Sequence, residues 1–449
     1  MDTWTERQRV SLTRCLETFE DQFREWEART ERAPWEIHYS QVRAATAHLG
    51  VLRDRLRQTL DEGQDNQIEL RVLSAWRVWE AFRNRLGQRQ EEMFRPGLTA
   101  ADEVAWACRI PIANAFERAK VPTPKQPPLA FLNGSVSPNA LVRARPFHAE
   151  PVFGEPLSRA AERLLESLPV PLIGLPWHEA FHAPAMVSIP HEAGHVVEAD
   201  FTLTAALDQA LAAAAPARAD DWKRWRAEVF ADHFAVRHCG PAFVGLLIDL
   251  LAPRFATTPA NAYPPHVVRM ELCLVALEEQ GLASQAAHRR LQWLQRVGPA
   301  NGTPDAPLAA EVRQIVRALG DLRVGNDRLA DVVAFHADRN RLVTELAADV
   351  RAGSWTNGEA DPTTVIATAW QVFEEDPNFF ARQDATEEIY ARILKAPGAG
   401  ARRGRDPRRS AAPGQARRSS PADTTDSYAD QARRFADQWL AERLDDRPE

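Results

Sequence analysis

Two histidines and a glutamate between residues 188 and 197 carry the clearest chemical pattern of the chain. His191, Glu192 and His195 form the pattern H-E-x-x-H. On a helix, residues four apart lie on one face, so His191 and His195 can present ring nitrogens to one tetrahedral Zn²⁺. Glu192 lies beside them, and a carboxylate there can take a proton from a water molecule that the cation activates. The pattern is typical of zinc hydrolases.

The same pattern occurs a second time, as HEAFH at residues 178–182. Prolines at positions 176 and 184 border this copy and leave little room for a regular helical turn. The copy at 191–195 has Pro190 at a plausible first helical position and continues to Glu198 without a helix breaker. We therefore predict that the copy at 191–195 binds the metal.

A tetrahedral site needs a third protein ligand. A histidine ligand of the metzincin kind is excluded, because Phe201 stands at its position. Aromatic residues in the segment 221–238 indicate a buried helical face, on which Glu228 and Asp232 lie one turn apart. Glu228 can complete the metal shell, and the Asp232 carboxylate can accept a hydrogen bond from the second ring nitrogen of a ligand histidine. Four other histidines lack a partner at ligand spacing and are expected to be core or surface residues: His233, His238, His266 and His336.

The two motifs together resemble those of the gluzincin metallopeptidases. HEAGH followed by EVFAD is similar to the motif pair of the thermolysin-like and CAAX-prenyl-endopeptidase-like enzymes, in which the glutamate of an E-x-x-x-D motif is the third ligand. The resemblance implies that His191, His195 and Glu228 hold one zinc ion per chain. It also implies that Glu192 is the general base and that Asp232 orients a ligand without touching the metal.

A third stretch resembles part of the T-H-P-P-x-x-x-R motif of the CAAX-prenyl-endopeptidase group. Here the sequence reads AYPPHVVR, with Tyr263 where that group has a histidine and with Arg269 at the final position. Both side chains could donate hydrogen bonds to the negative charge that develops on a carbonyl oxygen in the transition state. The resemblance is confined to short motifs between residues 188 and 269.

Composition and charge restrict the class of protein. The 449 residues are 45% hydrophobic and 26% charged, as in a soluble globular protein of two or three domains. The formal net charge of -7 does not indicate binding to nucleic acid or to a membrane surface. The four cysteines have no C-x-x-C spacing, and neither a secretion signal nor a membrane span is visible. We therefore expect a cytoplasmic protein, unlike the membrane-embedded CAAX-prenyl-endopeptidase group.

Helical periodicity dominates the rest of the chain and predicts a mostly α fold. Three amphipathic segments between residues 4 and 86 suit an antiparallel bundle, and a fourth, at 99–120, is interrupted by Pro111. We expect the strand at 169–177 to be the edge to which an extended peptide substrate adds. The predicted domains are an N-terminal helical bundle (1–120), a proline-rich linker (121–150), a zincin-like α+β metallopeptidase domain with a small sheet (151–396), a disordered arginine-rich linker (397–427) and a C-terminal amphipathic helix (428–449).

These observations predict a soluble zinc metallopeptidase that hydrolyses peptide bonds with a zinc-activated water and with Glu192 as the general base. Two alternatives stay open: a zinc hydrolase of a non-peptide substrate, and a non-catalytic helical interaction protein with a structural zinc site. Glu192 argues against a structural zinc site, because such a site usually takes four protein ligands and needs no base. The expected partners are a protein or peptide substrate and a protein bound through the N-terminal bundle or the C-terminal helix. The arginine-rich segment is more consistent with a solvated linker than with nucleic-acid binding.

Overall fold

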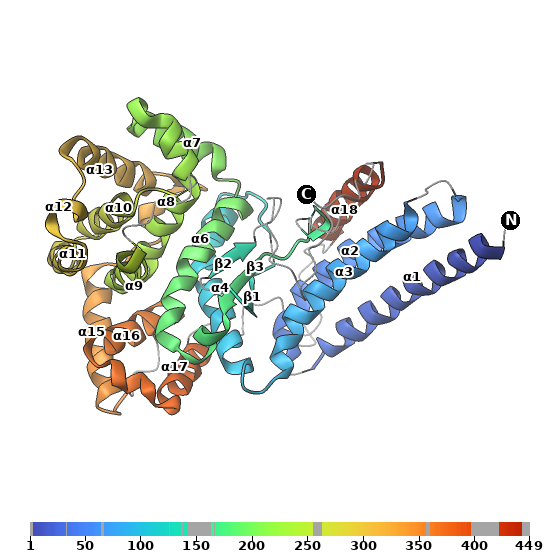
Figure 1. Ribbon diagram of the computed structural model, residues 1–449, viewed down its shortest axis with the longest axis horizontal. Coiled ribbons are helices and arrows are strands. Elements are labelled where there is room, and N and C mark those ends of the chain that lie inside the picture. The colour runs from blue at the N-terminus through green and yellow to red at the C-terminus, as the bar shows by residue number, and fades with distance from the viewer. Residues whose placement is uncertain are drawn as a thin grey trace, which may run out of the picture.

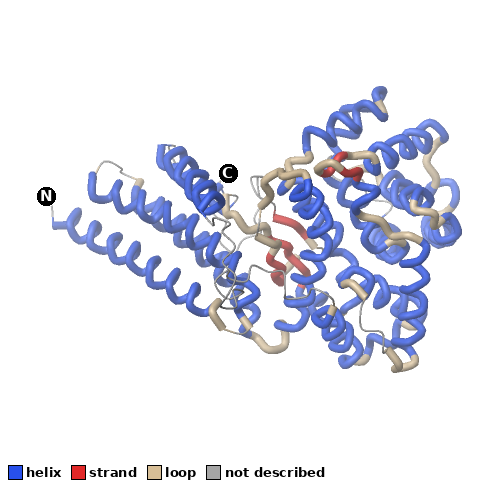
Figure 2. The backbone as a smooth tube through the Cα atoms, turned by 180° about the vertical axis from the view of Figure 1, so that it is seen from behind, coloured by secondary structure: helices blue, strands red, loops and turns tan. Residues whose placement is uncertain are grey.

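A computed structural model describes residues 3–32, 34–63, 67–124, 126–135, 138–141, 163–165, 167–254, 263–355, 360–396 and 422–441. Within these ranges the chain is mostly helical, with five short strands. Three of the strands lie between a helical bundle and a larger helical part (Figures 1 and 2). Among the described helices, none combines the length and the apolar composition that a membrane span requires.

Both ends of the chain contribute helices to the bundle (Figure 1). The apolar residues of each helix recur at helical spacing and face one hydrophobic cluster, in which Leu16, Leu52 and Phe82 are buried. The last helix packs on α2. The bundle helices are α1 (Thr3–Arg29), α2 (Tyr39–Glu62), α3 (Ile68–Gly87) and α18 (Ala422–Ala441).

Arg71 of α3 attaches the C-terminal helix to the bundle. Its guanidinium donates a hydrogen bond to the carbonyl oxygen of Trp439 (2.5 Å) and lies 5.3 Å from the centre of the Trp439 ring. Both residues are buried. The C-terminal helix therefore docks on its own chain.

The larger part of the molecule is built around a second hydrophobic cluster, to which the helices with the predicted metal ligands belong. A small antiparallel hairpin, β4 (Arg323–Val324) and β5 (Asp327–Arg328), lies at its surface. Its helices of ten residues or more are α4 (Arg95–Arg118), α6 (Ile189–Asp200), α7 (Thr204–Ala214), α8 (Ala219–Cys239), α9 (Pro241–Leu251), α10 (His266–Glu279), α11 (Ala283–Val297), α13 (Ala306–Gly320), α15 (Ala337–Arg351), α16 (Pro362–Glu375) and α17 (Gln383–Lys395). Two single-turn helices are α12 (Pro299–Gly302) and α14 (Leu329–Val332).

The position of α4 corrects the predicted domain boundary at residue 120. The buried residues of α4 belong to the larger cluster, and the helix packs against α6 and α17. It also continues through Pro111, where an interruption was predicted. Packing on both sides of the helix compensates for the hydrogen bond that the proline removes. The division between the bundle and the larger part therefore falls between α3 and α4.

The predicted proline-rich linker contains two strands of a three-stranded sheet. The strands β1 (Leu129–Asn133), β3 (Leu172–Pro176) and β2 (Asn139–Leu141) lie side by side in this order. β3 is parallel to β1 and antiparallel to β2. It coincides with the strand predicted at 169–177, but it is the central strand and cannot be the edge that receives a substrate. Its continuous apolar run is typical of a strand buried on both faces.

Side chains close the outer edge of β1. The backbone N–H of Ala130 donates to Asp102 (2.8 Å), and the Ala130 carbonyl oxygen accepts from Arg89 (2.8 Å). Gln88 makes the same pair of bonds with the backbone of Leu132, at 2.7 and 2.8 Å. These side chains take the place of a neighbouring strand and join the end of α3 to the sheet. Among the described strands, β2 forms the other edge.

We predict that Asp102→Ala destabilises the protein strongly. Asp102 is fully buried and pairs with Arg89 at 2.6 Å, so its loss leaves a buried guanidinium without its carboxylate. Removing one partner of a buried ion pair costs about 3–5 kcal/mol. The exposed pair of Arg341 and Asp338 provides the control, because Asp338→Ala should cost less than about 1 kcal/mol. Urea denaturation measures the stability of both variants. Equal midpoints for Asp102→Ala and Asp338→Ala would contradict the stabilising role of Asp102 at the edge of β1.

Candidate metal centre

The first turns of α6 present both histidines on one side of the helix. Pro190 lies at the start of α6, as the sequence predicts. The Nε2 atoms of His191 and His195 are 3.3 Å apart. Between them, Gly194 faces α8, where a Cβ atom would lie only 2.9 Å from the Cα atom of Ala231. The glycine thus allows α6 and α8 to approach closely, which a larger residue would prevent.

α8 supplies the third predicted ligand across this contact. The Glu228 carboxylate oxygens lie 3.5 Å from His191 Nε2 and 3.5 Å from His195 Nε2. Adjacent ligand atoms of a tetrahedral ion are about 3.3 Å apart when the metal–ligand bonds are ~2.0–2.1 Å long. In the described part of the chain, these three side chains are the group of His, Cys, Asp and Glu that could share one ion. Their spacing fits one tetrahedrally bound ion.

Asp232 and Arg269 lie behind this group. Asp232 Oδ1 is 2.9 Å from His191 Nδ1, within ion-pair distance. Arg269, from α10, donates two hydrogen bonds of 2.7 Å to the Asp232 carboxylate and approaches Glu228 to 3.6 Å. Both residues are buried. The guanidinium therefore holds Asp232 in place beside His191, while the Nε2 side of that ring faces Glu228.

The carboxylates make this centre favourable for positive charge. Burial alone lowers the pKa of His191, but its contacts with Asp232 and Glu228 outweigh burial and raise the pKa to about 10. Burial raises the pKa of Glu228, whereas His191, His195 and Arg269 together lower it well below the usual range. Glu228 is therefore a charged carboxylate at neutral pH. A divalent cation could take the place of the additional proton that the raised pKa gives to His191.

Glu192 lies next to the ligands without joining them. It is buried, and burial raises the pKa of its carboxyl group to about 7, against the opposing charge of His191. A carboxyl group with a pKa near neutrality can both accept a proton and release it again.

Two aromatic side chains border the centre. Phe243 of α9 stacks on the His191 ring, with ring centres 6.0 Å apart and an interplanar angle of 15°. Sequence reasoning missed this contact, because Phe243 is one of many apolar residues in its segment. The Tyr263 ring lies 6.0 Å from the Arg269 guanidinium carbon and is 43% exposed. The negative charge of Glu228 raises the pKa of Tyr263, so its hydroxyl group stays protonated.

The second copy of the pattern does not join this group of ligands, although burial and the nearby charge of Glu192 raise the pKa of its Glu179 to about 8. Residues 178–182 fall in and just after the short 3₁₀ helix η3 (Trp177–Phe181), as the bordering prolines predict. His182 packs against Phe373, with ring centres 4.7 Å apart. The structure therefore brings together, around one point, the following predicted residues: His191, His195, Glu228, Asp232, Arg269 and Tyr263, with Glu192 alongside.

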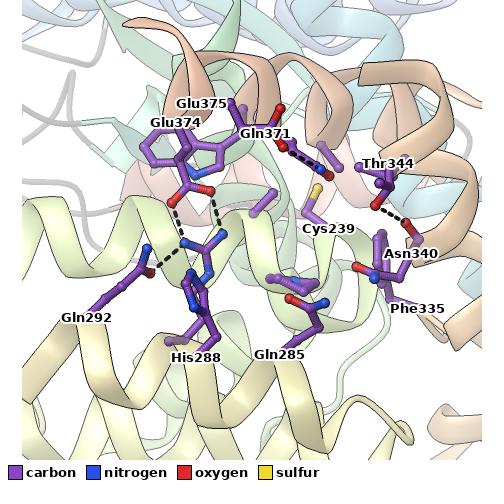
Figure 3. A pocket seen from close by; sticks show the side chains of 16 residues that line it. Cys239, Gln285, His288, Gln292, Phe335, Asn340, Thr344, Gln371, Glu374 and Glu375 are labelled. Carbon is purple, nitrogen blue, oxygen red and sulfur yellow. Dashed lines mark hydrogen bonds and ion pairs between the residues drawn. The ribbon is translucent and has the colours of Figure 1, made fainter. Parts of the chain in front are cut away.

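A polar hollow of about 280 Å³ between α9, α11, α15 and α16 is separate from this centre (Figure 3). None of its lining residues is a predicted ligand. Arg289 pairs there with both carboxylate oxygens of Glu374 and donates to Gln292 (2.8 Å). Because no residue of the metal centre lines it, the hollow is not part of that centre.

Comparison with known proteins identified no relative. No protein-family model matches the chain, and neither a curated protein nor a solved structure is significantly similar to it. The resemblance of the motifs to those of gluzincins thus stays a prediction. Any functional assignment depends on the geometry of the centre itself.

We predict one zinc ion per purified chain, held by the three converging side chains. His195→Ala and Glu228→Ala should each abolish stoichiometric zinc, because two ligands bind the ion far more weakly than three. The second copy provides the matched control, and His182→Ala should retain the metal. Elemental analysis after dialysis measures the content. Zinc that is lost from His182→Ala and retained by His195→Ala would show that the other copy binds the ion.

We further predict that Asp232→Asn weakens zinc binding without abolishing it. The change removes the charge that faces His191 but no ligand, and losses of this kind typically cost ~10 to 100-fold in metal affinity. Asp208→Asn, at the Arg226 ion pair outside the centre, is the control. Titration with a graded chelator compares the variants. Thermal unfolding in excess zinc distinguishes a folded variant that binds zinc weakly from a misfolded one. If folded Asp232→Asn binds zinc as tightly as the parent protein does, Asp232 does not support the ligand His191.

Proposed function

We propose that the protein is a zinc-dependent metallopeptidase. The observation that carries this proposal is the convergence of His191, His195 and Glu228 beside Glu192, a buried carboxyl group that is not a ligand. Three protein ligands are typical of catalytic zinc sites, which keep one position for water or substrate. A structural site would use a fourth ligand, and the residues that the structure describes include no further candidate at this centre.

The side chains around the centre suit peptide hydrolysis. Zinc supplies Lewis acidity, which activates water at neutral pH and polarises a carbonyl group. In the proposed reaction, Glu192 accepts the proton of the attacking water and passes it to the leaving nitrogen. The protonated hydroxyl of Tyr263 donates to the negative charge on the former carbonyl oxygen. Arg269 was predicted to contact the substrate. Because it donates two hydrogen bonds to Asp232, we propose instead that it positions the Asp232 carboxylate.

The sheet supports a peptide as the substrate. Asp102, Arg89 and Gln88 occupy the outer edge of β1, so β2 is the edge at which an extended chain could add. β2 contacts α6, the helix that carries the two histidines. A peptide paired with β2 by backbone hydrogen bonds would therefore lie beside this helix. This arrangement favours a peptidase over a hydrolase of a small non-peptide substrate.

We predict that Glu192→Gln keeps both zinc and fold but loses at least ~10²-fold in kcat/KM, since it removes the proton acceptor and no ligand. Glu345→Gln changes an exposed glutamate of α15 that pairs with Arg341 and should keep the parental activity. Digestion of a peptide library, followed by mass spectrometry, measures both variants against the zinc-loaded parent protein.

Two results would contradict this assignment. Equal turnover of Glu192→Gln and the parent would exclude Glu192 as the base. Hydrolysis of small esters or amides by a zinc-loaded parent that cleaves no library peptide would favour the non-peptide alternative.

A further inference from the structure

The second copy of the H-E-x-x-H pattern borders the metal centre, although it supplies no ligand. Its glutamate, Glu179, lies in η3, which follows β3 directly. A further 3₁₀ helix, η4 (Ala183–Ser188), then leads into α6. The charge of Glu192 contributes to the raised pKa of Glu179, so the two carboxyl groups are neighbours. Glu179 is therefore placed beside the proposed base, outside the group that could hold the ion.

The Glu179 carboxyl group lacks a partner among the residues that the structure describes. Its Oε2 atom is buried and makes no hydrogen bond. Burial and the negative charge of Glu192 raise its pKa, and no cationic side chain of the described ranges lowers it. Buried carboxyl groups are almost always paired or hydrogen-bonded. The exception at Glu179 indicates that its partner comes from outside the chain.

The hydroxyl groups of α17 that reach η3 bind its backbone instead of Glu179. Tyr390 donates to the carbonyl oxygen of Ala180 (2.9 Å). Thr386 donates to the carbonyl oxygen of Phe181 (3.3 Å). These bonds attach η3 to α17 and hold the backbone that carries Glu179 in place. A fixed carboxyl group without an internal partner is pre-organised to bind a ligand.

The turn that carries Glu179 lies at the surface of the molecule. Trp177 and Phe181, two residues before and after Glu179, are each 45% exposed. Glu179 itself is partly exposed, although its Oε2 atom is covered. We therefore expect a substrate at the metal centre to reach this side chain.

The local charge favours a cation as the ligand of Glu179. Glu179 and Glu192 place two acidic groups side by side, and the resulting negative potential disfavours an anion. A second metal ion does not suit the position, because the described residues offer no further group of ligands that could share one. A protonated primary amine suits it, since a compact ammonium group combines positive charge with three hydrogen-bond donors. An adjacent ammonium group also stabilises the ionised form of Glu179, which burial disfavours.

We propose that Glu179 binds a protonated primary amine of the peptide substrate beside the scissile bond and thereby determines specificity. The amine is the α-ammonium group of the N-terminus or the ammonium group of a lysine side chain. The first source would make the protein an aminopeptidase, and the second a peptidase that cleaves next to lysine. This inference rests on the proposed peptidase function. Proton transfer stays with Glu192, and Glu179 only holds the substrate.

Matched peptides test the proposal on the zinc-loaded full chain. A peptide that the protein cleaves is prepared with a lysine next to the cleaved bond, and each of its two amines is then acetylated separately. Acetylation removes the charge and keeps the rest of the peptide. Acetylation of one amine should lower kcat/KM at least ~10-fold, the effect of losing one hydrogen bond between charged groups. Whether this is the N-terminal or the lysine amine identifies the source.

Glu179→Gln tests whether this preference belongs to the residue. Glutamine has the size of glutamate but no negative charge, so kcat/KM for the unmodified peptide should fall ~10-fold or more. The value for the acetylated peptide should stay near that of the parent protein, whereas a merely structural role of Glu179 would change both values equally. Glu345→Gln, on the exposed face of α15, is the matched control and should keep the parental preference.

Several results would overturn the proposal. Equal cleavage of all the peptides by the parent protein would exclude an amine site and leave the peptidase function intact. A folded Glu179→Gln variant that still prefers the unmodified peptide would exclude Glu179 as the binding group. Equal losses for every peptide in that variant would mean that water, rather than a substrate amine, satisfies the carboxyl group.

The failure of the peptidase function itself would look different. If the zinc-loaded parent protein cleaves no peptide, the proposed function is wrong and the amine site is wrong with it. The peptide series on the parent protein decides whether an amine is recognised even if Glu179→Gln does not fold.

Discussion

The close packing of α6 against α8 is the constraint on which the metal centre depends. Gly194 meets the backbone of Ala231, so the two helix axes approach without an intervening side chain. At this separation Glu228 lies within 3.5 Å of both histidine Nε2 atoms. A larger residue at position 194 would separate the histidines from the glutamate, although all three would keep their places in the sequence.

The free-energy cost of burying charged groups at the centre is offset by the pairing of those groups with one another. Four ionisable groups, His191, Glu228, Asp232 and Arg269, lie together with little access to water. Isolated, each would be costly to bury. The two hydrogen bonds from Arg269 to Asp232 offset part of this cost and fix a carboxylate behind His191. The same arrangement leaves Glu228 as a negative charge that faces the two histidines.

The bundle and the larger helical part are joined through the sheet. Gln88 and Arg89, which follow directly after α3, bind backbone groups on the outer edge of β1. This contact satisfies polar groups that an exposed edge strand would present to other chains. Arg71 and Trp439 add the last helix to the bundle. The bundle is thus a fixed support for the sheet rather than an appendage.

The sequence by itself determined the features that depend on local spacing. Helical periodicity predicted most helices, the interval of four residues placed His191 beside His195, and prolines excluded a regular helix for the copy at 178–182. Only the tertiary structure decided which elements meet. It made β3 a central strand, moved α4 into the larger core and paired Arg269 with Asp232. These outcomes depend on contacts between residues far apart in the chain, which arise from packing and charge pairing in three dimensions and leave no periodic signal in the sequence.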